Sequence, residues 1–170
     1  MSLSTDPASI ANSLDTLDSI LPQANQQKFL RFGLQAESTA LIKVADTAAI
    51  FQVTPAEILP VPQMPSCVLG IYNWRSEMLW TIDLAQLLGL TLFASAGAMV
   101  VVIAVDNQYL GLVVAEVIDI EWYDTAEIQT PSAKLFTPEL LPFMKGYIGD
   151  SGSIILDPAR IASSPLLQLS

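Results

Sequence analysis

Alternation of apolar and polar residues predicts strands along most of the chain. Residues 29–34 alternate between two faces in the manner of a strand with at least one buried face. A polar turn over 35–39 and an apolar segment over 40–44 complete a hairpin, and 50–53 and 58–61 continue the β pattern. These element lengths suit a small barrel rather than a large open sheet.

An internal repeat with a shift of 70 residues is the most informative pattern. Residues 40–46 correspond to 110–116; each copy follows an extended apolar strand and a polar turn, and each ends in a carboxylate, Asp46 or Glu116. Later strands over 78–82 and 153–156 each run into an aspartate, Asp83 or Asp157. Each aspartate is suited to cap a short helix, over 84–88 or 158–162. We therefore expect two similar β units of about seventy residues.

The segment before the first strand has a different period. Asp6-Pro7 is a suitable helix start, and Ile10, Leu14, Leu17 and Leu21 follow at spacings of four, three and four. Pro22 ends this stripe, and residues 23–27 form a polar linker. Two interpretations stay open for this amphipathic helix: it packs back on the body, or it docks into a groove of a partner.

Two other segments need a specific interpretation. Residues 122–143 contain three prolines and are expected to form a connection with a short helical turn around 138–141. Residues 84–105 carry no charge and are long enough to span a membrane. Their glycines, their β-branched second half and their acidic flanks instead favour a short helix, a turn and a buried strand. The first six residues lack the basic start and long apolar region of a secretory signal.

Composition narrows the possible functions. Seven Lys and Arg against 17 Asp and Glu give a net charge of −10, which disfavours nucleic acid and membrane surfaces as partners. The chain has no His, so the usual triads, His-ligated metals and phosphohistidine chemistry are not expected. We interpret Cys67, the single cysteine, as a packing residue, and we expect the protein to reside in a reducing cytoplasm. We expect no enzyme activity, no cofactor, no metal and no direct membrane insertion.

The remaining candidate motifs have structural interpretations. Asp46 and Glu116 could pair as acids for hydrolysis, but the repeat explains them as matched strand ends. We interpret Asp83 and Asp157 as helix caps in preference to metal ligands. The glycines over 146–152 have the wrong spacing for a phosphate-binding loop and precede a strand.

The order and spacing of several motifs resemble the CheW-like domain, the adapter of bacterial chemosensory arrays. The resemblance rests on residues 58–62 with Pro65, 68–75, 79–84, 88–90, 110–117, 146–148 and 154–157. It implies a mainly β fold of two interlocked five-stranded SH3-like barrels over residues 28–170, with a few short helices. Residues 1–27 would be an N-terminal amphipathic helix and linker. It also implies a non-catalytic, cytoplasmic scaffold that couples a CheA-type histidine kinase to the cytoplasmic tip of a methyl-accepting receptor, in chemotaxis, pilus motility or phototaxis.

The resemblance assigns one protein-binding site of the family to this chain by its position in the sequence. The family's Asn-x-Arg turn, whose Arg is associated with assembly of the kinase complex, falls on Asn73-Trp74-Arg75. An Arg on a turn can pair with a carboxylate of a partner, and Tyr72, Trp74 and Trp80 could supply aromatic anchors. The alternative is that Arg75 only balances Glu77 at the surface. This chain departs from the family by Trp74 in place of a small aliphatic residue and by Ser76 in place of Gly.

A function of another class also stays open. Unpaired barrel edges could join copies of the chain by strand addition, which would make it a self-assembling structural module. An adapter, by contrast, should stay small until its partner is added.

Overall fold

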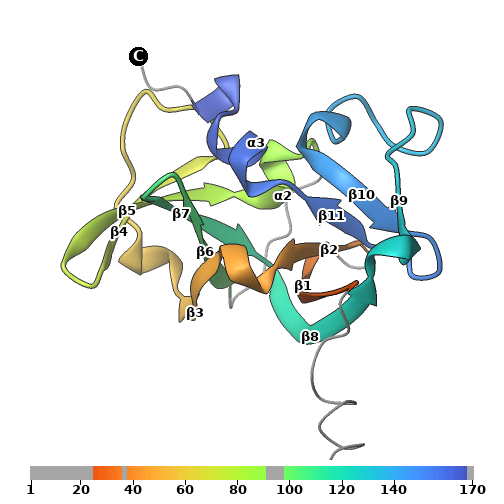
Figure 1. Cartoon of the computed structure of the whole chain (residues 1–170). Coiled ribbons are helices and arrows are strands. Elements are labelled where there is room, and N and C mark those ends of the chain that lie inside the picture. The colour runs from red at the N-terminus through yellow and green to blue at the C-terminus, as the bar shows by residue number, and fades with distance from the viewer. Residues whose placement is uncertain (1–24, 36–37, 91–97, 168–170) are drawn as a thin grey trace, which may run out of the picture.

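The computed structural model describes residues 25–35, 38–90 and 98–167, and strands in two sheets make up most of it (Figure 1). In spatial order the first sheet holds β8 (Glu116–Asp124), β1 (Gln26–Gln35), β2 (Ser38–Lys43), β11 (Ile154–Leu156), β10 (Met144–Ile148) and β9 (Ile128–Gln129). The second sheet holds β3 (Thr47–Val53), β6 (Ala98–Val105), β7 (Gln108–Val114), β5 (Glu77–Asp83) and β4 (Val68–Trp74). The predicted mainly β class is confirmed.

Short helices join these strands. The α-helices are α2 (Leu84–Leu87) and α3 (Pro158–Ala162). The 3₁₀-helices are η1 (Val44–Asp46), η2 (Pro55–Glu57), η3 (Thr125–Glu127), η4 (Leu141–Phe143) and η5 (Pro165–Leu167). Among the described residues, no helix has the length and apolar character needed to cross a membrane. The uncharged run from 84 begins with α2 and ends in strand β6, as expected.

The two sheets follow one plan and exchange a strand with each other. The hairpin β1–β2 continues into β11, which runs parallel to β2, and the hairpin β6–β7 continues into β5, which runs parallel to β7. The strand after each hairpin crosses to the other sheet: β3 pairs with β6, and β8 pairs with β1. The predicted repeat and the interlocking of two units are thus confirmed.

One sheet differs from the expected five strands, and the repeat identifies the extra strand. The first sheet has a sixth strand, β9, of two residues, which pairs with β10. Its counterpart in the second unit is a single bridge between Leu59 and Ile71. The strand predicted over 58–61 is absent there, so this prediction was wrong. The rings of Pro60 and Pro62 fix φ near −65°, away from the φ of about −120 to −140° of a regular strand, so this segment does not continue as a strand beyond one bridge.

Helix caps repeat as well. Asp83 accepts a hydrogen bond from the N–H of Gln86 at 3.2 Å, and Asp157 accepts one from the N–H of Ala159 at 3.0 Å. The predicted caps of α2 and α3 are therefore confirmed. Capping boxes that sequence analysis missed, Thr54 with Glu57 and Asp124 with Glu127, begin η2 and η3 at the same shift of 70 residues.

A shared core lies between the two sheets, and a smaller cluster covers the other face of each. In β6, Val101 and Ile103 belong to the shared core, whereas Val100 and Val102 belong to a cluster on the opposite face. Phe29 belongs to the matching cluster of the first sheet. This division follows from the two-residue period of a strand. Buried Val, Ile and Leu on both faces explain why these strands read as continuous apolar runs.

Several boundaries differ from expectation. Strand β1 begins at Gln26, so Gln26 and Gln27 pair with β8 instead of belonging to the linker. The connection after Trp122 contains the end of β8, η3 and β9. Its predicted helical turn around 138–141 is confirmed, because the N–H groups of Leu140 and Leu141 both donate to the Thr137 carbonyl at 3.1 Å, and η4 follows directly. The predicted helix over 6–21 lies outside the described residues.

Candidate protein-binding surfaces

The β4–β5 turn places Arg75 at the tip of a hairpin. Trp74 pairs with Glu77, so the loop consists of Arg75 and Ser76 alone, with φ angles of 52° and 64°. Two consecutive positive φ angles are the signature of a type I′ turn, which matches the twist of the flanking strands. The hairpin β6–β7 has the equivalent turn at Asp106 and Asn107. Both Arg75 and Ser76 are exposed.

The Arg75 side chain stacks on its neighbour. Its guanidinium carbon lies 4.7 Å from the ring centroid of Trp74, a cation–π contact. Trp74 is only 8% exposed and meets Tyr109 edge-on, with ring centroids 5.1 Å apart. Within the part of the chain that the structure describes, no ion pair joins Arg75 to Glu77. Trp74 therefore acts as a platform under Arg75 rather than as an exposed anchor.

The structure separates the other predicted aromatic residues. Tyr72 lies on the same face as Trp74 and stacks on Phe51, with ring centroids 4.9 Å apart. Trp80 comes from the partner strand β5 and lies on the opposite face, because it alternates with Leu79 of the cluster beneath Tyr72. Asn73 is exposed and pairs with Met78, which is 77% exposed. The turn and Trp80 thus belong to different surfaces.

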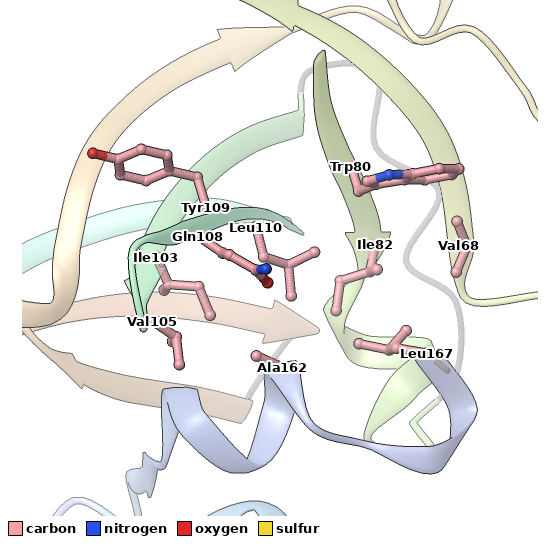
Figure 2. Close-up of a pocket in the computed structure, with 10 residues that line it drawn as sticks. All are labelled: Val68, Trp80, Ile82, Ile103, Val105, Gln108, Tyr109, Leu110, Ala162 and Leu167. Carbon is pink, nitrogen blue, oxygen red and sulfur yellow. The ribbon is translucent and has the colours of Figure 1, made fainter. Parts of the chain in front are cut away.

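Trp80 lines an apolar pocket of about 180 Å³ between the second sheet and the C-terminal helices. Figure 2 shows Trp80 and Val68 at one side, Ile103 and Val105 at the other, and Ala162 and Leu167 where the chain leaves α3. The polar side chain of Gln108 also points toward this space. The lining is suited to an apolar group.

A second surface, which sequence analysis did not assign to residues, lies where the exchanged strands meet. We call it the interunit groove; it is lined by Leu30, Val44, residues 47–50 and Ile120. Ile50 of β3 and Ile120 of β8 are 40% and 46% exposed. Farther along β8, Trp122 is 40% exposed, with the Lys28 amino group 5.4 Å from its ring centroid. The only sequence signal was the apolar alternation at 118, 120 and 122, which also fits a buried strand.

A polar cluster fixes β8 against β1. Arg31 contacts Glu121 at 3.3 Å, and the Tyr123 hydroxyl donates to the other oxygen of Glu121 at 2.5 Å. Burial, followed by the hydrogen bond and charge of Glu121, raises the pKa of Tyr123 to about 12. The cluster therefore holds the exchanged strand that forms one wall of the interunit groove.

The residues considered as candidates for catalysis or metal binding occupy structural positions. Asp46 ends η1 and Glu116 begins β8, at equivalent points of the repeat. No set of three or more His, Cys, Asp or Glu side chains among the described residues is arranged to hold a metal ion. Cys67 is buried in the shared core, and this burial raises the pKa of its thiol.

Comparisons with known proteins agree with this architecture. A search of curated proteins found no match. The structure is similar to that of the scaffolding protein TtCheW from Thermoanaerobacter tengcongensis, with a TM-score of 0.68 and 24% identity, over 77% of this chain and 88% of that one. At that identity the likeness supports the fold alone. The sequence model of the CheW-like domain matches residues 28–165, which include both β units. The chain therefore belongs to the CheW-like domain family.

Proposed function

We propose that this protein is a non-catalytic cytoplasmic adapter that joins a CheA-type histidine kinase to the cytoplasmic tip of a chemoreceptor or phototaxis receptor. The observation that carries the proposal is the match of the CheW-like domain to residues 28–165, through both units. A scaffold needs two separate binding surfaces, and the hairpin tip at Arg75 and the interunit groove supply two. The absence of His from the sequence agrees with a role without proton transfer.

The hairpin tip is the proposed kinase contact. A flexible Arg loses rotamer freedom when it pairs with a partner's carboxylate, and this loss weakens binding. The Trp74 ring already restricts the Arg75 guanidinium, at 4.7 Å, so less freedom remains to be lost. Trp74, where the family usually has a small aliphatic residue, would thus pre-organise the Arg rather than displace it. The planar guanidinium can still present its N–H groups to a carboxylate.

The interunit groove is the proposed receptor contact. Its lining is apolar, and Ile50 and Ile120 stand on the two exchanged strands that form its walls. An amphipathic helix places apolar residues at i, i+3, i+4 and i+7 into a groove of this kind. A receptor tip made of a helical hairpin can supply such a stripe.

Two charge-changing substitutions test the two contacts separately. Arg75→Glu should abolish kinase co-purification and leave receptor binding and the circular dichroism spectrum unchanged. Lys134→Glu is the matched control. Lys134 is an exposed cation in the 131–137 loop and belongs neither to the Arg75 turn nor to the lining of the interunit groove. Ile120→Asp should do the opposite, weakening receptor binding by at least about tenfold while kinase binding persists. Unchanged kinase binding by Arg75→Glu would remove Arg75 from the contact.

A self-assembling module is the second candidate function. It is favoured by β8, a nine-residue strand at the edge of the first sheet with exposed Ile118 and Ile120. Edge strands of this length are templates for strand addition. Light scattering over a concentration range separates the candidates: a mass that grows with concentration in the absence of any partner supports assembly, and a constant monomer mass supports the adapter.

A further inference from the structure

The apolar surface along β8 is continuous with the core. Ile120 pairs across the sheet with Leu30, which is buried in the shared core and also lines the interunit groove. Trp122 follows two residues later and therefore lies on the same face. We call Ile50, Ile120 and Trp122 the edge patch; each is at least 40% exposed. Ile50 and Ile120 line the groove, and Trp122 continues the same face of β8 beyond it. Exposed apolar side chains gathered in this way indicate a surface that something covers.

The segment that precedes β1 in the same chain is a candidate to cover this patch. The carbonyl of Asn25 accepts a hydrogen bond from the N–H of Thr125 at 2.8 Å, and Gln26 pairs with Asp124. The preceding residues therefore enter beside β8 at Thr125, three residues from Trp122, which is about 10 Å along a strand. The four residues from Leu21 to Asn25 span up to about 14 Å. Leu21 can thus reach Trp122.

The dimensions of the sequence-predicted helix also match the patch. From Ile10 to Leu21 its apolar stripe would be about 16 Å long at 1.5 Å per residue. Ile118 to Trp122 extend about 13 Å along β8, and the groove continues from there to Ile50. At about 100° per residue, Asp15 and Asp18 fall outside the stripe. Lys28, beside Trp122, supplies a cation at that end of the patch.

We propose that residues 6–21 dock as an amphipathic helix on the edge patch of their own chain and cover the interunit groove. Tethering favours this occupant over a second copy, because a short linker gives an effective concentration in the millimolar range. The consequence rests on the proposed function: a receptor helix must displace this segment before it binds. The domain then carries its own competitor for the receptor contact.

Paramagnetic broadening of the tryptophan side chains tests the docking without any partner. A nitroxide is attached to Thr16→Cys in a Cys67→Ala background, and the indole N–H signals of the three tryptophans are recorded in the full chain. We expect selective broadening of the Trp122 signal, unchanged on dilution. Leu14→Asp with Leu17→Asp should abolish it. Asn12→Asp with Ser19→Asp adds the same charge on the opposite side of the helix and should preserve it.

Three results would overturn the docking. They are an unbroadened Trp122, broadening that persists with Leu14→Asp and Leu17→Asp, and broadening seen when the nitroxide is on one copy and the observed nuclei are on another. The last result would assign the patch to a second copy.

A binding measurement tests the consequence. If the segment covers the groove nine-tenths of the time, its release raises the affinity for a receptor tip about tenfold. The variant with Leu14→Asp and Leu17→Asp should show this gain, and the variant with Asn12→Asp and Ser19→Asp should not. Equal affinities would refute the competition. Broadening of Trp122 with no receptor binding by any variant would refute the proposed function and leave the docking intact.

Discussion

Gly70→Ala should destabilise the second unit more than any other exchange of a described glycine for alanine. Gly70 has a φ of +140°, and a Cβ built there would lie 2.1 Å from the carbonyl oxygen of Leu59. Atoms cannot approach so closely, so the segment that carries Leu59 must move away. That segment is held by the bridge to Ile71, whose two hydrogen bonds are 2.8 and 2.9 Å long, and by Ile58, which packs against the cluster that contains Trp74.

The magnitude follows from these contacts. Loss of the two bridge hydrogen bonds costs about 1 kcal/mol each. A backbone conformation that alanine rarely adopts costs about 1–3 kcal/mol more. The sum is a loss of about 3–5 kcal/mol in the free energy of unfolding, a large share of the 5–15 kcal/mol typical of a domain. Because β4 ends at the Arg75 turn, the same change should weaken the proposed kinase contact.

Urea unfolding followed by circular dichroism measures the loss. Gly152→Ala is the matched control, since Gly152 also has a positive φ, +69°, but a Cβ there meets nothing within 4 Å. It should cost only about 1–2 kcal/mol, the price of a left-handed alanine. If the loss with Gly70→Ala exceeds that of the control by less than about 1 kcal/mol, the close approach of Leu59 does not constrain β4 as argued.

Two further predictions concern the turn and the β1–β8 seam. Ser76→Gly should raise the free energy of unfolding by about 0.5–1 kcal/mol, because Ser76 holds a φ of 64° that glycine adopts without strain; a lower melting temperature would contradict this. Tyr123 should titrate at about 12 in the near-ultraviolet difference spectrum between the parent and Tyr123→Phe, and Glu121→Gln should lower that pKa. Since the folded pKa is raised above the ordinary 10.0, the stability from Tyr123 is complete below pH 10.0 and is lost as pH rises toward about 12.

The hairpins and the repeat could be predicted because they are local. A two-residue apolar period with a polar turn specifies a hairpin, and a second copy 70 residues later specifies a second unit. Strand exchange is different, because β3 alternates between half-buried and exposed positions in a way that would suit either sheet. Only the tertiary arrangement decides that β3 pairs with β6 and β8 with β1.

The candidate surfaces show the same limit. The position of Arg75 on a turn was predictable from Asn73-Trp74-Arg75, but its stacking on Trp74 depends on the two positive φ angles of the turn. Trp80 and Tyr72 both flank that turn in the sequence, which predicts a common surface, but they lie on opposite faces of the sheet. No prediction was made for Ile120 and Trp122, because their exposure follows only from the place of β8 at the sheet edge.

Strand exchange predicts that the two units unfold together. Removal of β8 would leave β1 without its outer partner, and removal of β3 would do the same to β6. Neither hairpin unit is therefore complete without a segment that belongs, in sequence, to the other. Two-state behaviour requires that probes in different places report one transition.

Two single-tryptophan proteins make this prediction measurable. Trp80 alone, after Trp74→Phe and Trp122→Phe, reports on the second sheet, and Trp122 alone, after Trp74→Phe and Trp80→Phe, reports on the first. In each protein the fluorescence midpoint in urea should equal the circular dichroism midpoint. A fluorescence midpoint at a lower urea concentration than the circular dichroism midpoint would show that the units separate. Coincident transitions would mean that the interunit groove, with one wall on each exchanged strand, exists only when the whole domain is folded.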